Sequence, residues 1–282
     1  MRNAIVFSLL GLLAASCGYH DGTEIQSEAV HADTLGTKVT FASLPAFKQK
    51  NNPSHGDVLN DIVSHEAPGD SNHYDDLVTL GHETSHGIHS YIRNKLGKGT
   101  GKANGFYVLG NKAVVIEEPS VRKSDAAKYI PSNLHGKRYN LYITGQKEWD
   151  DTPLYIWDEW NAYINGAAVG VDLVDKGLWK AGWRDAVAGN IEFTVYAIAI
   201  AQAVKEKDPE YYAKNEQFKQ FLAFNTRRAM KGFHEGRVMS QFKYKEQDEY
   251  YEKLLSSPEA EEFRTKTREM FGKKFTKEVL GF

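Results

Sequence analysis

The chain has 282 residues, a formal net charge of −2 and a single cysteine. Hydrophobic residues make up 41% and aromatic residues 12% of it, which excludes an intrinsically disordered chain and allows a sizeable core. The near-neutral charge argues against bulk binding of nucleic acid. One cysteine excludes an intrachain disulfide and any CxxC metal site, so the place of that cysteine, Cys17, needs an explanation of its own.

The first residues have the pattern of an export signal. Arg2 supplies a positive charge, residues 4–13 are apolar, and small residues precede Cys17. This pattern predicts a signal peptide over residues 1–16, and the apolar run is too short to cross a bilayer as a mature helix. The residues LLAASC resemble the lipobox of bacterial lipoproteins, which implies that Cys17 is lipidated and becomes the first mature residue.

This resemblance implies an exported protein that its lipid anchors to a membrane, with the outer membrane, facing the periplasm or the cell surface, as the expected location. The alternative is an ordinary cleaved signal peptide with an incidental cysteine. Residues 17–40 are polar and show no apolar period, so we expect a flexible tether there. Residues 41–282 contain no repeat or low-complexity block and are expected to form a single domain.

Residues 41–72 are rich in turn-forming residues, and the first clear element follows them. Residues 74–95 predict a helix, with acidic residues at its positive amino end. The glycine-rich stretch 97–105 comes next and predicts a flexible connector. It departs from a phosphate-binding P-loop because Leu96 and Ala103 stand where that motif needs a glycine and a serine or threonine.

The second half of the chain is predicted to be helical after a short β region. Apolar runs 106–109 and 112–117 on either side of Gly110 and Asn111 predict a β-hairpin, and the alternating stretch 138–144 predicts another strand. We expect helices over 154–175, 184–206, 209–231, 244–256 and 258–280. The fold class is therefore α+β, mainly helical, with a small antiparallel sheet and a helical C-terminal half.

His82, Glu83 and His86 form an HExxH sequence in the first helix. Histidines four residues apart lie on one face of a helix, so both could reach one Zn²⁺ at about 2.0–2.1 Å. Glu83 could then take a proton from a water that the metal activates. Apolar residues at helical spacing, such as Leu80 and Ile88, leave the histidines on the other side, where they could face a cleft. A surface helix with two solvated histidines is the alternative.

His89 follows on the same face as the two histidines. A helix rarely offers three adjacent histidines to one tetrahedral metal, so we expect His89 to support the site or to contact a substrate. The metzincin pattern HExxHxxGxxH requires a glycine where His89 stands and a histidine where Ile92 stands. That clan of zinc peptidases is therefore excluded.

The residues IWDEWNAY, at 156–163, resemble the glutamate-bearing helix of HExxH zinc metallopeptidases of the gluzincin type. This resemblance implies a zincin-like fold, one zinc ion with Glu159 as its third protein ligand, and hydrolysis of a peptide or protein substrate with Glu83 as general base. Two features depart from the family. The predicted strands follow the HExxH helix, whereas thermolysin-like enzymes place most of the sheet before it. Tyr163 stands where several of these families have an acid that orients a histidine ligand.

Several assignments remain open. Glu192 is the sole charge in the apolar run 187–204, and a buried carboxylate needs a partner such as a metal or a cation. The other candidates for the third ligand are Asp158, Glu117 and Glu118. A donor should stabilise the oxyanion that forms in peptide hydrolysis, and the candidates are His234, Tyr163, Tyr155 and Tyr107.

Two further functions remain compatible with the sequence. One is a zinc protein with another hydrolytic or a non-catalytic role. The other is a surface lipoprotein for binding or adhesion in which HExxH is incidental. For a peptidase, the hairpin at 106–117 could bind an extended peptide by edge-strand addition.

Overall fold

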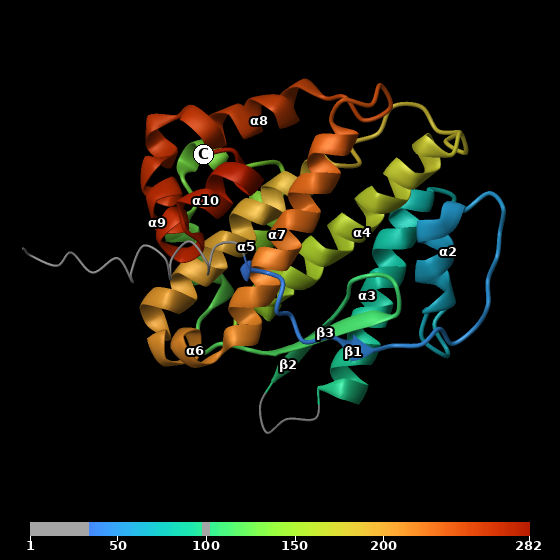
Figure 1. Ribbon diagram of the computed structural model, residues 1–282, viewed down its shortest axis with the longest axis horizontal. Helices are drawn as coiled ribbons and strands as arrows, with labels where there is room; N and C mark the ends of the chain where they lie inside the picture. The colour runs from blue at the N-terminus through green and yellow to red at the C-terminus, as the bar shows by residue number, and fades with distance from the viewer. Residues whose placement is uncertain (1–33, 98–101) are drawn as a thin grey trace, which may run out of the picture.

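The computed structural model describes residues 34–97 and 102–282 (Figure 1). It is mainly helical with a small antiparallel sheet, which confirms the fold class at that level. The helices and strands are β1 (Ala42–Ser43), α2 (Gly56–Ser64), α3 (Leu77–Leu96), β2 (Ala103–Tyr107), β3 (Lys112–Glu117), α4 (Tyr155–Asp175), α5 (Ala188–Lys207), α6 (Pro209–Lys214), α7 (Glu216–Gly236), α8 (Lys245–Ser256), α9 (Glu261–Phe271) and α10 (Lys273–Phe275).

The helix α5 forms the centre of the larger hydrophobic core. All its residues from Ala188 to Val204 are buried, and both α4 and α7 pack against it. Trp157 of α4 stacks on Phe218 of α7 with ring centroids 4.5 Å apart. In Figure 1, α2, α3 and α4 lie on one side of the molecule and α8, α9 and α10 on the other. The core therefore fixes α4 on one face and leaves its other face for α3.

The sheet has three strands in the order β1-β3-β2, all antiparallel. Phe106 lies opposite Val114, so the predicted β-hairpin is confirmed. The edge strand β2 packs directly on the second half of α3. At Gly105 an added Cβ would lie 2.4 Å from Cγ2 of Ile92 and 2.7 Å from the backbone nitrogen of Arg93. Only a glycine permits this approach of strand to helix.

The helix α3 begins after Asp76, whose side chain accepts hydrogen bonds from the backbone N–H groups of Val78 and Thr79. It runs antiparallel to α4, because Val78 contacts Gly166 whereas His89 contacts the earlier Asp158. An added Cβ at Gly166 would lie 3.1 Å from the carbonyl oxygen of Val78. A small residue at this crossing lets the two helices approach closely.

The strand predicted over 138–144 is wrong. Residues Asn140–Thr144 form a π-helical turn. The buried ammonium group of Lys123 donates hydrogen bonds to the carbonyl oxygens of Tyr142, Ile143 and Gly145 at 2.6, 3.1 and 2.7 Å. Three nearly consecutive carbonyls can converge on one cation at the end of a helical turn, whereas along a strand they alternate in direction.

The helix predicted over 74–95 begins three residues later, at Leu77, and three of the helices predicted for the second half of the chain also have different bounds. The helix predicted over 184–206 begins only at Ala188. The one predicted over 209–231 is divided at Asn215, whose side chain accepts the N–H of Phe218 at 3.0 Å and so caps α7. The one predicted over 258–280 is interrupted at Gly272, where φ is +80°. Side-chain caps and a left-handed residue end helices that apolar periodicity alone would continue.

The predicted tether over 17–40 is too long at its C-terminal end. Leu35 and Val39 are buried, and the N–H of Gly36 donates a hydrogen bond to Gln220 of α7 at 2.7 Å. Residues 34–40 therefore pack against the folded body. The predicted signal peptide and Cys17 lie outside the described residues. Among the residues that are described, no helix is long and apolar enough to span a membrane.

We expect Gly105→Ala to lower the free energy of unfolding by about 1–3 kcal/mol, because the new methyl group would overlap Ile92 and the backbone of α3. Denaturant titration measures the change. Gly182→Ala is the matched control, since nothing lies within 4 Å of its added Cβ, and its effect should stay within about 0.5 kcal/mol. Equal midpoints for the two variants would show that the contact between β2 and α3 does not limit stability.

Candidate metal centre

Three side chains from α3 and α4 bring their ligand atoms close together. The Nε2 atoms of His82 and His86 lie 3.1 Å apart, and Oε2 of Glu159 lies 3.7 Å from the first and 3.5 Å from the second. Ligands at about 2.0–2.1 Å from a tetrahedral metal are about 3.3–3.4 Å from one another. The triangle of the three ligand atoms therefore has nearly the size of one face of a tetrahedral coordination shell.

The carboxylate of Glu159 is only half satisfied by the protein. Its Oε1 accepts a hydrogen bond from the hydroxyl of Tyr155 at 2.7 Å, whereas its buried Oε2 has no hydrogen-bond partner within the described chain. The ion-pair contacts of Oε2 are the Nε2 atoms of His82 and His86, at 3.7 and 3.5 Å. A buried carboxylate oxygen without a hydrogen bond is costly. A cation between Glu159, His82 and His86 would remove this cost, so the cluster fits a divalent metal ion.

Asp158, the residue before Glu159, orients the histidines. Its Oδ1 accepts a hydrogen bond from Nδ1 of His86 at 2.5 Å and another from Nδ1 of His89 at 3.0 Å. With its proton on Nδ1, His86 directs the lone pair of Nε2 toward His82 and Glu159. Asp158 also forms a second possible ligand group with His86 and His89, but this group is already joined by hydrogen bonds.

His89 is fully buried and both of its ring nitrogens are occupied. The amide nitrogen of Asn161 donates to Nε2 of His89 at 2.9 Å, which leaves the proton of His89 on Nδ1, facing Asp158. The amide cannot be reversed, because its oxygen accepts from Arg228 at 2.9 Å. His89 therefore supports Asp158, and it is not among the residues that line the neighbouring cavity.

The electrostatics of the cluster call for one cation. Burial, reinforced by His86, lowers the pKa of His82 to about 4. Burial also acts against a charge on His86, but Asp158 and Glu159 hold its pKa well above the usual value. Burial acts against ionisation of Asp158 as well, yet the histidines keep its pKa low. The histidines lower the pKa of Glu159 as well, against its burial, so both carboxylates remain ionised. A proton on His86 balances one of these two charges, whereas a divalent metal ion would balance both.

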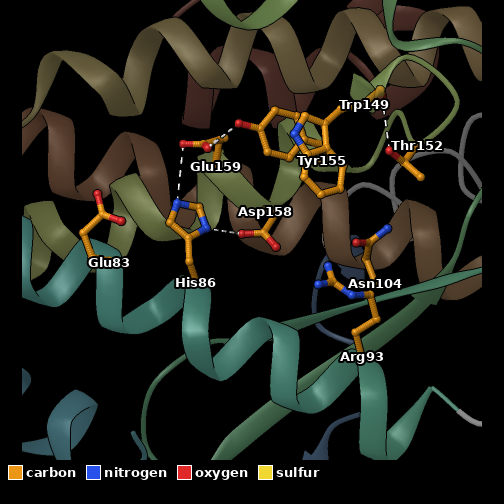
Figure 2. Close-up of a pocket in the computed structure, with 9 residues that line it drawn as sticks. All are labelled: Glu83, His86, Arg93, Asn104, Trp149, Thr152, Tyr155, Asp158 and Glu159. Carbon is orange, nitrogen blue, oxygen red and sulfur yellow. Dashed lines mark hydrogen bonds and ion pairs between the residues drawn. The ribbon is translucent and has the colours of Figure 1, made fainter. Parts of the chain in front are cut away.

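A cavity of about 490 Å³ opens beside the cluster. Figure 2 shows Glu83 and His86 projecting from α3, with Glu159 and Tyr155 of α4 across from them. The side chain of Glu83 forms no hydrogen bond or ion pair with any other residue in the described ranges. Its carboxylate is therefore free to exchange a proton with a molecule in the cavity.

The other candidates for the third ligand lie elsewhere. Glu192 is buried, but Arg138 is its partner, with a side-chain ion pair of 2.8 Å and a backbone N–H donated at 3.1 Å. Glu117 is exposed. Glu118 accepts hydrogen bonds from Asn104 and from the backbone N–H of Leu154. None of the three carboxylates belongs to a metal-ligand group.

Of the four candidate oxyanion donors, two lie at the cluster and two lie elsewhere. Tyr155 lines the cavity and bonds to Glu159, and the ring of Tyr163 packs edge-on against His82 with centroids 4.6 Å apart. Tyr107 donates to Asp61 at 2.7 Å on the α2 side. His234 packs against two rings of another part of the core, those of Phe233 and Tyr251.

The supporting residues carry no motif in the sequence. The sequence presents Asp158 only as a rival ligand, and it singles out neither Asn161 nor Arg228. The signal was present, since Asp158, Glu159 and Asn161 are polar residues in a segment whose other members, such as Trp157 and Trp160, are fully buried. Polar side chains on a buried face must find polar partners.

We expect Asp158→Asn to weaken the affinity of the cluster for divalent metal about 10- to 100-fold, because an amide cannot hold two imidazoles as a carboxylate does. Calorimetric titration of metal-free protein measures it. Asp175→Asn, on the exposed end of the same helix, is the control and should leave the affinity unchanged. Equal affinities for Asp158→Asn and the unmodified protein would remove Asp158 from the site.

Comparison of the chain with known protein families, with curated proteins and with solved structures gives no match. The geometry of the cluster and of the cavity beside it must therefore carry the assignment of function.

Proposed function

We propose that this protein is a zinc-dependent peptidase in which His82, His86 and Glu159 hold the metal and Glu83 is the general base. The observation that carries the proposal is the triangle of ligand atoms, in which the buried Oε2 of Glu159 forms no hydrogen bond. It stands at the wall of a cavity that an unengaged carboxylate also lines. Two imidazoles, one carboxylate and an open side are typical of a catalytic zinc site.

The donor set alone would also suit other metals, since two histidines and one carboxylate bind non-haem Fe(II) as well. The position of Glu83 favours hydrolysis with zinc. When bound, zinc supplies a Lewis acid that lowers the pKa of water and polarises the scissile carbonyl. Glu83 would accept the proton of the attacking water and pass it to the leaving amine. Tyr155, held by Glu159, and Asp158, held by the histidines, would keep the ligands in place during these steps.

The edge of β2 offers a place for an extended substrate. The backbone N–H of Val108 donates to the carbonyl oxygen of Lys112, and that of Glu118 donates to the carbonyl oxygen of Lys102. The even-numbered residues of β2 therefore form the hydrogen-bonded pairs with β3. The backbone groups of odd-numbered residues therefore point to the outer edge. At this edge the carbonyl oxygen of Tyr107 accepts hydrogen bonds from the side-chain amides of Asn161 and Asn165 of α4. Asn104 lines the cavity. A peptide strand added beside Ala103, the one residue of β2 that is not buried, would enter the cavity next to the cluster.

Purified protein should contain one zinc per chain, and removal of the zinc by a chelator should stop peptide hydrolysis. Glu83→Gln should retain the metal and lose about 100- to 10,000-fold in kcat, because the proton acceptor is gone while the ligands remain. Elemental analysis and a peptide-hydrolysis assay measure the two effects. Glu117→Gln, an exposed glutamate outside the cluster, is the matched control and should match the unmodified protein in both.

The outcomes separate the competing functions. Unchanged hydrolysis by zinc-loaded Glu83→Gln would overturn the role of Glu83. Stoichiometric zinc without hydrolysis of any peptide would point to a non-catalytic zinc protein. Absence of stoichiometric metal, with no effect of chelation, would favour a binding or adhesion lipoprotein with an incidental HExxH.

We also propose that the protein is exported and anchored to a membrane by lipid on Cys17, on the basis of the LLAASC sequence. In a bacterial host, Cys17→Ser should move the protein from the membrane fraction to the soluble exported fraction and remove the mass of the lipid, as measured by fractionation and mass spectrometry. Ser16→Ala, which keeps a small residue before the cysteine, is the control. Membrane association that persists in Cys17→Ser would refute the anchor.

A further inference from the structure

The cavity beside the cluster has two ends of opposite charge (Figure 2). Glu83, Asp158 and Glu159 stand at one end, around His86. At the other end the guanidinium of Arg93 lies beside Asn104. The rings of Trp149 and Tyr155, stacked with centroids 5.0 Å apart, form the wall across from α3.

Arg93 lies on the same face of α3 as His86. Seven residues separate them, which is close to two helical turns and places them about 10.5 Å apart along the axis. An extended peptide advances about 3.3 Å per residue. A substrate that runs along this face from the cluster therefore reaches Arg93 with a group about three residues away.

No carboxylate forms an ion pair with Arg93 among the described residues, although the charge of Arg93 acts on the nearby carboxyl of Glu118. The side chain of Arg93 donates one hydrogen bond, to Oγ of Ser90 at 3.3 Å. The nearby carboxyl of Glu118 is held by Asn104 and Leu154. Burial raises the pKa of Glu118 to about 7, against these hydrogen bonds and the charges of Lys102 and Arg93.

We propose that Arg93 binds a carboxylate of the substrate two to three residues from the scissile bond. This inference rests on the proposed peptidase function. A guanidinium binds a carboxylate through two parallel hydrogen bonds, whereas the acidic end of the cavity repels the same group. The carboxylate belongs either to an aspartate or glutamate side chain or to the C-terminus of the peptide, and both present the same chemistry to Arg93.

Two matched peptide series distinguish these sources. The first places Asp or Glu, against Asn or Gln, at each of three positions on either side of the scissile bond. The second compares a free C-terminus with an amidated one. Zinc-loaded protein should favour the carboxylate member about 10- to 100-fold in kcat/KM at a single position. An effect in the first series assigns a side chain, and an effect in the second assigns the terminus.

Variants then test Arg93 itself. In Arg93→Gln the ratio of kcat/KM between the carboxylate peptide and its neutral partner should fall to about 1. Arg93→Lys should retain part of the preference. Arg93→Glu should instead favour a basic residue at that position. Lys95→Gln, an exposed cation in the same turn of α3, is the control and should keep the full preference. Circular dichroism and zinc content establish that each variant is folded and loaded.

The outcomes separate this inference from the proposed function on which it rests. Hydrolysis of the neutral and carboxylate peptides at equal rates overturns the role of Arg93 and leaves the peptidase standing. A carboxylate preference that persists in Arg93→Gln also overturns it. Failure of zinc-loaded protein to cleave any peptide overturns the peptidase, and the role of Arg93 in substrate binding with it.

Discussion

The carboxylate of Asp158 is the contact on which the candidate metal centre depends, because it joins the two helices that carry the candidate ligands. One of its oxygens accepts hydrogen bonds from His86 and His89, which lie nearly one turn apart on α3. The two bonds fix the rotation of α3 against α4. Glu159 follows Asp158 directly in the chain, so the same contact sets the place of the third candidate ligand. Removing one partner of a buried pair leaves the other uncompensated, and here the uncompensated groups would be two histidines of the site.

This contact is supported from α7, a helix in which the sequence shows no motif. Arg228 donates hydrogen bonds to the amide oxygens of Asn161 and Asn165 at 2.9 and 2.8 Å, and burial lowers its pKa to about 10. The amide of Asn161 continues the chain to His89 and so to Asp158. A cation at one end and a carboxylate at the other align the dipoles between them, and satisfied hydrogen bonds in series strengthen one another. The orientation of a ligand on α3 is thus determined partly by a residue that lies far along the sequence.

The sequence was most informative where one element carries a complete pattern. Helical spacing predicted that His82 and His86 share a face of α3, and the hairpin around Gly110 was predicted from its turn residues. The sequence was least informative where contacts with residues distant in the chain determine the local structure. Within the strand expected over 138–144, residues Asn140–Thr144 form a π-helical turn, and Lys123 binds carbonyl oxygens at its end. Periodicity reports which residues are apolar, but it does not report a cation that arrives from another segment.

The buried Oε2 of Glu159, which forms no hydrogen bond, shows how the fold and the site depend on each other. A carboxylate with a free buried oxygen beside two imidazoles is unfavourable by itself, and a flexible chain would turn it toward water. The structure prevents this, because Trp157 and Trp160 on either side of Glu159 are fully buried against α5 and α7, and Tyr155 holds the other carboxylate oxygen. Packing of the aromatic core thus holds Oε2 of Glu159 in a position where it forms no hydrogen bond. Because a bound cation would satisfy that group only in the folded chain, metal binding and folding should be thermodynamically linked.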